Sequence, residues 1–126
     1  MSINFRQKYD LILNRKRGGG YYIWKFDIIS QKLNDIDEND ILVYIDSGCT
    51  INMGGSELFK TYVKLIKESD YGILSFESYW KEKCYTTRQI FEYFGENPNH
   101  SIGNTGQYIS GVLIMKKCEH LDIILK

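Results

Sequence analysis

The apolar run Ile41–Ile45, which reads ILVYI and ends on Asp46, constrains the fold more than any other stretch of the chain. A short continuous apolar run bounded by turn residues is typical of a strand buried on both faces, as in a parallel sheet. In open α/β sheets, ligands bind beyond the carboxyl ends of such strands. Asp46 is therefore a candidate ligand-binding residue. The alternative is that its side chain only caps the turn formed by Ser47 and Gly48.

Length and composition indicate one globular domain spanning residues 1–126. Apolar residues make up 43% and charged residues 25%, which is ordinary for a folded chain and argues against disorder. The 16 basic and 16 acidic residues cancel, so the charge gives no support for general nucleic-acid or membrane-surface binding. No apolar run approaches the roughly 20 residues of a membrane helix, and residues 1–10 do not resemble a signal peptide. The sequence therefore predicts a cytoplasmic protein.

The cysteines and the codon bias add two further expectations. Three widely spaced cysteines and two distant histidines exclude a zinc-finger spacing and argue against a disulfide framework. The chain has no alanine and is rich in Ile, Lys, Asn and Tyr, a bias that low-GC coding produces. We therefore expect the source to be a low-GC bacterium or a large DNA virus.

The spacing of apolar residues predicts alternating helices and strands. Helices are expected over residues 4–14, over 21–33, from Ser56 through 66, over 86–94 and over 116–126. Strands are expected over residues 41–45, 71–76 and 108–115, with a bulge or a close backbone approach at Gly111. Residues 78–85 and 95–106 are expected to be irregular. Two apolar helix stripes are predicted to be buried. The stripe of the helix over residues 21–33 comprises Tyr22, Phe26, Ile29 and Leu33. The stripe of the helix that starts at Ser56 comprises Leu58, Phe59, Tyr62, Leu65 and Ile66. This alternation favours an α/β layer fold.

A basic, glycine-rich run lies upstream of the first strand. Arg15, Lys16 and Arg17 precede three glycines and a predicted helix start, an arrangement that favours phosphate binding. The alternative is a solvated basic loop with a flexible hinge. The run is not a P-loop, because no Gly-Lys-Ser/Thr follows at the required spacing. The aromatic residues directly after it could stack on a base or a sugar, or belong to the core.

Two motifs together resemble a group of glycosyltransferases with the GT-A nucleotide-diphospho-sugar fold. Residues 17–25 read RGGGYYIWK, and residues 40–49 read DILVYIDSGC. Members of that group carry RGxGYWxWKP about twenty residues before a strand that ends YxD[A/S]GC. Weaker matches extend the resemblance over roughly residues 17 to 117. It implies a partial, three-layer Rossmann-like GT-A sheet with few strands and helices on both faces.

The resemblance also implies roles for individual residues. Asp46 would bind the donor ribose or a metal ion, and Arg17 and Lys25 would neutralise the diphosphate of the leaving group. Gln107 would contact the donor sugar or the acceptor. Glu77 and Glu82, carboxylates that follow a predicted strand, are candidates for the catalytic base or an acceptor contact.

The chain departs from the pattern of the group at several places. Tyr22 replaces a Trp, Phe26 replaces a Pro, and Thr87 replaces a frequent Lys. Gly48 stands where GT-A enzymes commonly have the second Asp of an Asp-x-Asp metal motif. Asp46 with diphosphate oxygens and water is the remaining donor set for Mg²⁺ or Mn²⁺. Only sixteen residues precede Arg17, so a short or truncated member of the group is expected.

The sequence leaves three functions open. The first is a glycosyltransferase that moves a sugar from a nucleotide-diphosphate sugar to a saccharide or other hydroxyl acceptor. The second is a non-catalytic GT-A remnant or interaction module, which would self-associate because a partial sheet leaves an unpaired edge. The third is a phosphoryl-transfer enzyme with Asp46 as nucleophile, which lacks the second aspartate expected for that chemistry.

Overall fold

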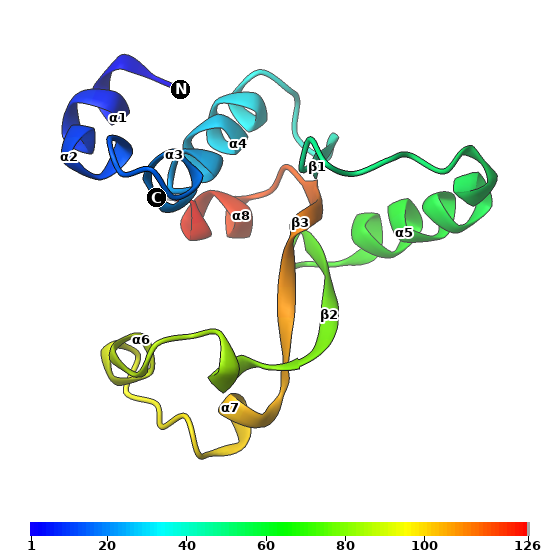
Figure 1. Ribbon diagram of the computed structural model, residues 1–126. Helices are drawn as coiled ribbons and strands as arrows, with labels where there is room; N and C mark the ends of the chain where they lie inside the picture. Colours follow the sequence, from blue (N-terminus) through cyan, green and yellow to red (C-terminus); the bar gives the residue numbers. More distant parts are fainter. Residues whose placement is uncertain (126) are drawn as a thin grey trace.

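A three-stranded sheet with the order β1-β3-β2 organises the computed structural model, which describes residues 1–125 (Figure 1). The strands are β1 (Ile41–Ile45), β2 (Ile73–Lys81) and β3 (Gly106–Lys116). The α-helices of the described part are α1 (Ile3–Lys8), α2 (Asp10–Leu13), α3 (Gly18–Tyr21), α4 (Trp24–Asn34), α5 (Ser56–Glu68), α6 (Arg88–Tyr93), α7 (Ser101–Asn104) and α8 (Glu119–Ile124). Two 3₁₀ turns complete the elements, η1 (Met53–Gly55) and η2 (Glu82–Cys84). Lys126, the end of the predicted last helix, lies outside the described residues.

The mixed α/β class and the three predicted strands are confirmed, but the expected parallel pairing is wrong. Both β1 and β2 pair antiparallel with β3. The segment β1-α5-β2 does connect two strands that run in the same direction, as the alternation predicted. However, β3 lies between these strands, so neither finds a parallel partner. An antiparallel sheet can leave one face exposed to water, and one face of this sheet is only partly covered.

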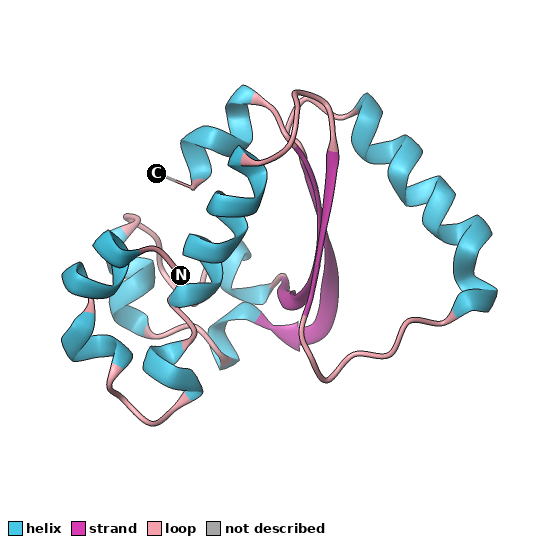
Figure 2. Ribbon diagram, turned by 90° about the horizontal axis from the view of Figure 1, so that it is seen from above, coloured by secondary structure: helices cyan, strands magenta, loops and turns pink. Residues whose placement is uncertain are grey.

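One face of the sheet carries the core of the protein. Side chains of β1 alternate between the two faces, so Leu42, Tyr44 and Asp46 share one face, on which Leu42 and Tyr44 pack against the buried cluster. Helices α4 and α8 cover this side of the sheet (Figure 2). The central buried cluster comprises Ile29, Leu33, Leu113, Met115 and Leu121.

The other face is covered only in part by α5, which lies on the opposite side of the sheet from α4 (Figure 2). Near its C-terminal end, Ile66 is buried, and the Lys116 ammonium donates to the carbonyls of Lys67 and Ser69 at 3.2 and 2.6 Å. A cation bound to the last carbonyls of a helix stabilises its C-terminus. Leu58, in the first turn of α5, and Leu65, directly before Ile66, are both more than half exposed. The predicted burial of the α5 stripe is therefore wrong for most of its residues.

The prediction that the first strand is buried on both faces is wrong, because the α5 side of β1 is partly exposed. Val43 and Ile45 point toward α5 and remain 40% and 37% exposed. An apolar groove of about 450 Å³ lies beside these residues, and Leu58, Phe59 and Tyr62 line it from the side of α5.

The N-terminal region differs from the predicted pair of helices. The first helix is divided at Tyr9 into α1 and α2, and the second begins at Trp24 instead of residue 21. Before it, all residues from Gly18 to Tyr22 have positive φ, so the chain makes a left-handed turn through the glycine run. The indole N–H of Trp24 donates to the Gly18 carbonyl at 2.9 Å and fixes this turn against the start of α4. As a result Tyr22 and Phe26, predicted to be buried, are more than half exposed.

The C-terminal half follows the predictions with shifted boundaries. β2 continues through residues predicted to be irregular, and α7 forms within the predicted loop over residues 95–106. The predicted helix over residues 86–94 is α6, which begins only at Arg88, so Thr86, whose spacing to Gln89 predicts a capping box, lies before the helix and does not cap it. The expectation at Gly111 is confirmed, because the β2-β3 register shifts between the pairs Leu74–Ile114 and Phe76–Ile109. None of the helices in the part described has the length and apolar character that a membrane span requires.

Candidate functional site

Asp46 lies directly after β1, on the sheet face that α4 covers. Its backbone N–H donates to the Gly111 carbonyl at 2.8 Å, which continues the β1-β3 ladder by one residue. A Cβ atom at Gly111 would lie 3.1 Å from Asp46 Oδ2. The irregular segment of β3 therefore makes room for the carboxylate.

Tyr44 is the first side chain that holds Asp46 in place. The two residues are separated by one position in a strand, so their side chains lie on the same face. The Tyr44 hydroxyl donates to Asp46 Oδ1 at 2.7 Å.

Lys25, in the first turn of α4, is the second side chain that holds Asp46 in place. Its ammonium lies 3.1 Å from Asp46 Oδ1 and donates to the Ser110 carbonyl at 3.0 Å. It also lies over the Tyr44 ring, 5.0 Å from the centroid, within the range of a cation–π interaction. Lys25 is only 5% exposed, and buried lysines are rare unless they are paired. This contact joins the two motifs RGGGYYIWK and DILVYIDSGC in space.

The electrostatics of this group keep Asp46 ionised. The hydrogen bond from Tyr44, and next the contact with Lys25, lower the pKa of Asp46 below its usual value. Burial, and next the adjacent carboxylate, raise the pKa of Tyr44 to about 12. At neutral pH Asp46 is therefore a carboxylate and Tyr44 a neutral phenol.

A pocket of about 370 Å³ opens over this group. Its lining residues are Tyr21, Tyr22, Ile23, Lys25, Phe26, Asp46 and Ser110. Aromatic walls with a few convergent polar groups are typical of small-molecule sites. Tyr21 and Tyr22 have φ of 56° and 65°, a left-handed conformation that is uncommon for aromatic residues and often found at functional sites.

The pocket offers one carboxylate to a metal ion. Within residues 1–125 no group of three or more His, Cys, Asp or Glu side chains lies close enough to hold one. The Lys25 ammonium, 3.1 Å from Oδ1, would also repel a divalent cation at that oxygen. The donor set does not fit a metal held by the protein alone, and the Mg²⁺ or Mn²⁺ expected at Asp46 stays a prediction.

The other predicted site residues lie outside the pocket lining. Arg17 is exposed and immediately precedes the left-handed turn. Gln107 is near the start of β3, four residues before Gly111. The Glu77 carboxylate accepts the Gly106 N–H at 2.8 Å, and Glu77 pairs with Tyr108 across the sheet.

Glu82 also belongs to this far end of the sheet. Its carboxylate accepts the Thr86 hydroxyl, and its backbone N–H donates to the Thr105 carbonyl at 2.9 Å. The structure therefore brings Lys25 and Asp46 together, while Glu77, Glu82 and Gln107 gather near the start of β3.

Tyr44 and Ser110 are the site residues that sequence reasoning missed. The signal for Tyr44 was present, because a tyrosine two positions before an aspartate in a strand shares its face. Ser110 contributes only its carbonyl, which depends on the β3 irregularity and has no signal in the residue type.

The comparisons with known proteins do not extend these observations. Matched against protein families, curated proteins and solved structures, the chain shows no significant similarity to any of them.

Proposed function

We propose that the pocket over Asp46 binds a nucleotide-diphosphate sugar and that the chain is a glycosyltransferase acting on a saccharide or other hydroxyl acceptor. The observation that carries the proposal is the Lys25–Asp46 contact. The two sequence motifs that resemble GT-A glycosyltransferases lie about twenty residues apart, and this contact places both on one pocket.

The state of Asp46 suits it to bind hydroxyl groups. The contacts from Tyr44 and Lys25 both use Oδ1, and the Asp46 side chain is 46% exposed. Oδ2 is therefore available to accept a hydrogen bond from a ribose or sugar hydroxyl. Its charge strengthens such a bond, because ionised acceptors bind hydroxyl donors more strongly than neutral acceptors do.

The aromatic wall suits a base or a sugar ring. Tyr21, Tyr22 and Phe26 are each more than half exposed and line the pocket. Stacking of a base on an aromatic side chain contributes about 1–3 kcal/mol. A pocket of about 370 Å³ lies near the small end of the range for ligand sites and suits one part of a nucleotide sugar.

Within this proposal, Lys25 acts as a positioning residue. Its ammonium already bonds Asp46 and the Ser110 carbonyl, so its charge is used to orient the carboxylate. Arg17, exposed beside the glycine turn, remains the proposed contact for the diphosphate.

Titration calorimetry with UDP-sugars and GDP-sugars, with and without Mn²⁺, tests the proposal. We expect at least one of these donors to bind, and we expect Asp46→Asn to reduce the affinity at least tenfold. The control is Asp70→Asn, an exposed aspartate on the loop before β2, which should bind like the wild type. The proposal fails if no donor binds, or if Asp46→Asn binds with unchanged affinity.

The second function, a non-catalytic interaction module, is favoured by one observation. Strand β1 lies at the edge of the sheet, and within residues 1–125 it pairs only with β3. A chain that binds no donor and still associates through this edge would support the module instead of the enzyme.

A further inference from the structure

The free edge of β1 is regular, apolar and unprotected. Its register against β3 has no irregularity from Ile41 to Ile45, and this segment contains no charge and no proline. Natural proteins protect exposed edges with lysines, prolines or bulges, because an open edge pairs with other strands. The opposite edge, β2, has such protection, since its register is irregular and it carries Glu77 and Lys81.

The hydrogen bonds of β1 identify the groups that are free to pair. Lys117 N–H donates to the Asp40 carbonyl, and Asp46 N–H donates to the Gly111 carbonyl. In an antiparallel ladder, bonded and outward-facing residues alternate. The backbone groups of Ile41, Val43 and Ile45 therefore point away from β3, along the open edge.

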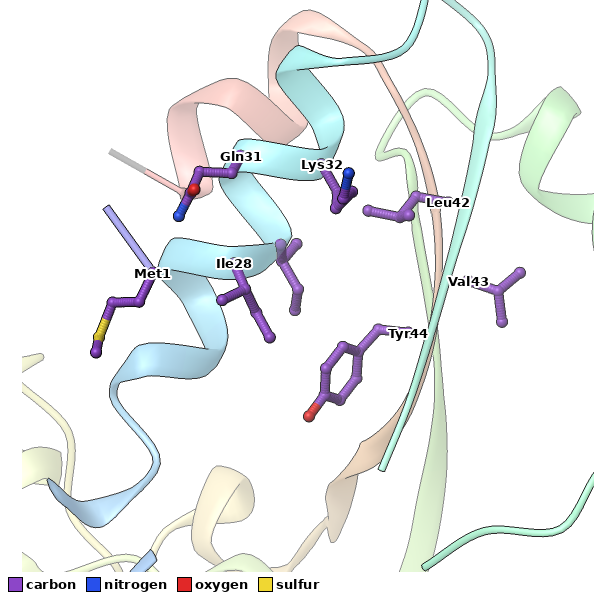
Figure 3. A pocket seen from close by; sticks show the side chains of 8 residues that line it. Met1, Ile28, Gln31, Lys32, Leu42, Val43 and Tyr44 are labelled. Atoms are coloured by element: carbon purple, nitrogen blue, oxygen red, sulfur yellow. The ribbon is translucent and has the colours of Figure 1, made fainter. Parts of the chain in front are cut away.

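Hollows flank this edge on both faces of the sheet. On the α4 side, a pocket of about 310 Å³ is lined by Ile28, Leu42 and Tyr44, with Val43 at its margin (Figure 3). On the α5 side is the apolar groove beside Val43, Ile45 and Phe59. A strand added to β1 would place alternate side chains over the two hollows.

The total exposed surface indicates how much area is available for a partner. The chain exposes 9662 Å², whereas a compact monomer of 14.8 kDa exposes about 7,000 Å². The difference of about 2,700 Å² exceeds the roughly 800 Å² that each partner buries in a standard interface.

We propose that β1 pairs antiparallel with β1 of a second copy of this chain, forming a continuous six-stranded sheet across a two-fold axis at Val43. This register pairs Val43 with Val43 and Ile41 with Ile45, so that every outward backbone group of the strand finds a partner. The two grooves then meet as one apolar surface. The net charge of zero gives no long-range repulsion between the copies.

The register also limits the length of the pairing. Asp40 and Asp46 bound the apolar segment, and in this register Asp40 of each copy would lie opposite Asp46 of the other. Like charges that face each other in this way are unfavourable, so pairing is confined to the five residues of β1. The proposal does not depend on donor binding, because it concerns the β1 edge and not the pocket over Asp46.

Sedimentation velocity between about 1 and 100 µM tests the association. We expect a species of twice 14.8 kDa for the wild type. Val43→Lys should raise the dissociation constant at least tenfold, because it places two ammonium groups at the axis. The matched control is Ile73→Lys on the outer edge of β2, where the exposure of 36% is close to the 40% of Val43. A wild-type monomer at 100 µM, or equal effects of the two variants, overturns the proposal.

Hydrogen exchange of the unmodified protein gives a readout that does not depend on variants. In the dimer the amides of Val43 and Ile45 are protected as strongly as those of Leu42 and Tyr44. In a monomer only Leu42 and Tyr44, which bond β3, are protected. An alternating pattern at 100 µM that does not change on dilution would overturn the proposal.

Discussion

Removing the Tyr44 hydroxyl tests the electrostatic description of the site most directly. Tyr44→Phe keeps the ring and deletes one hydrogen bond, 2.7 Å long, to an ionised carboxylate. Hydrogen bonds to charged groups contribute about 1.5–3 kcal/mol when they are shielded from water. Because the Asp46 side chain is 46% exposed, water replaces part of this bond, and we expect a loss of about 1 kcal/mol. For a chain of this size the melting temperature should fall by about 3–4 °C.

The loss of stability caused by Tyr44→Phe should depend on pH in a defined direction. The pKa of Asp46 is lowered in the folded state, so its stabilisation is present above the unfolded pKa and is lost as the pH falls through the folded pKa. The pKa of Tyr44 is raised from 10.0 to about 12, so its contribution is present below pH 10 and is lost between pH 10 and about 12. The difference between wild type and Tyr44→Phe should therefore be full at pH 7 and decrease in acid and above pH 10.

Urea unfolding followed by tryptophan fluorescence measures this difference. A double-mutant cycle of Tyr44→Phe with Asp46→Asn should give a coupling of about 1 kcal/mol at pH 7. The control is Tyr93→Phe, an exposed residue of α6, which should change stability by less than about 0.5 kcal/mol. Additive effects in the cycle, or a Tyr44→Phe loss of equal size at pH 3 and pH 7, would refute the reasoning.

Two further predictions concern the groups around Asp46. Lys25→Met keeps most of the buried stem but deletes the contacts to Asp46 and Ser110, so it should raise the pKa of Asp46 in an NMR titration and cost about 1–2 kcal/mol of stability. Lys32→Met, at an exposed position of the same helix, is its control, and an unchanged Asp46 pKa in Lys25→Met would contradict the assignment. Gly111→Ala should lower stability by about 1 kcal/mol, because its Cβ would press on Asp46 Oδ2. Gly48→Ala adds a methyl group with no neighbour within 4 Å, and equal melting temperatures of the two alanine variants would count against this crowding.

The sequence predicted local structure better than it predicted pairing. Ile41–Ile45 forms the expected strand because its residues favour an extended, buried backbone. The pairing of β1 with β3 joins residues more than sixty positions apart, as in the pair Val43–Ile114, and it places β3 between β1 and β2. No local pattern encodes such a contact.

Burial was harder to predict than element type. The periodicity of Leu58, Phe59, Tyr62 and Leu65 correctly indicated a helix, but an apolar stripe does not state whether a partner covers it. The same holds for Val43, whose apolar side chain reads as core and lies on an open face.

The candidate site was predicted in part. Asp46 was identified by its place at a strand end, and Lys25 by its motif, but the role assigned to Lys25 was a diphosphate contact. Only the folded chain shows that its ammonium is bound to Asp46 and Ser110. The prediction for Glu77 and Glu82 rests on their position after a strand, yet β2 extends beyond Glu77, and both residues make contacts near Thr105 and Gly106.

The way α5 is fixed has a mechanical consequence. Its C-terminal end is anchored by buried Ile66 and by Lys116, and its middle contacts β2 through the rings of Tyr62 and Phe76, whose centroids are 5.3 Å apart. Leu58 and Phe59, in its first turn, are 56% and 43% exposed. The C-terminal end of α5 is therefore held more firmly than its N-terminal end. The free energy of local opening follows the density of buried contacts, so it should increase along α5 from the first turn toward Ile66. We therefore expect the first turn of α5 to open locally more readily than its last turn, which would change the width of the groove while the strands stay paired.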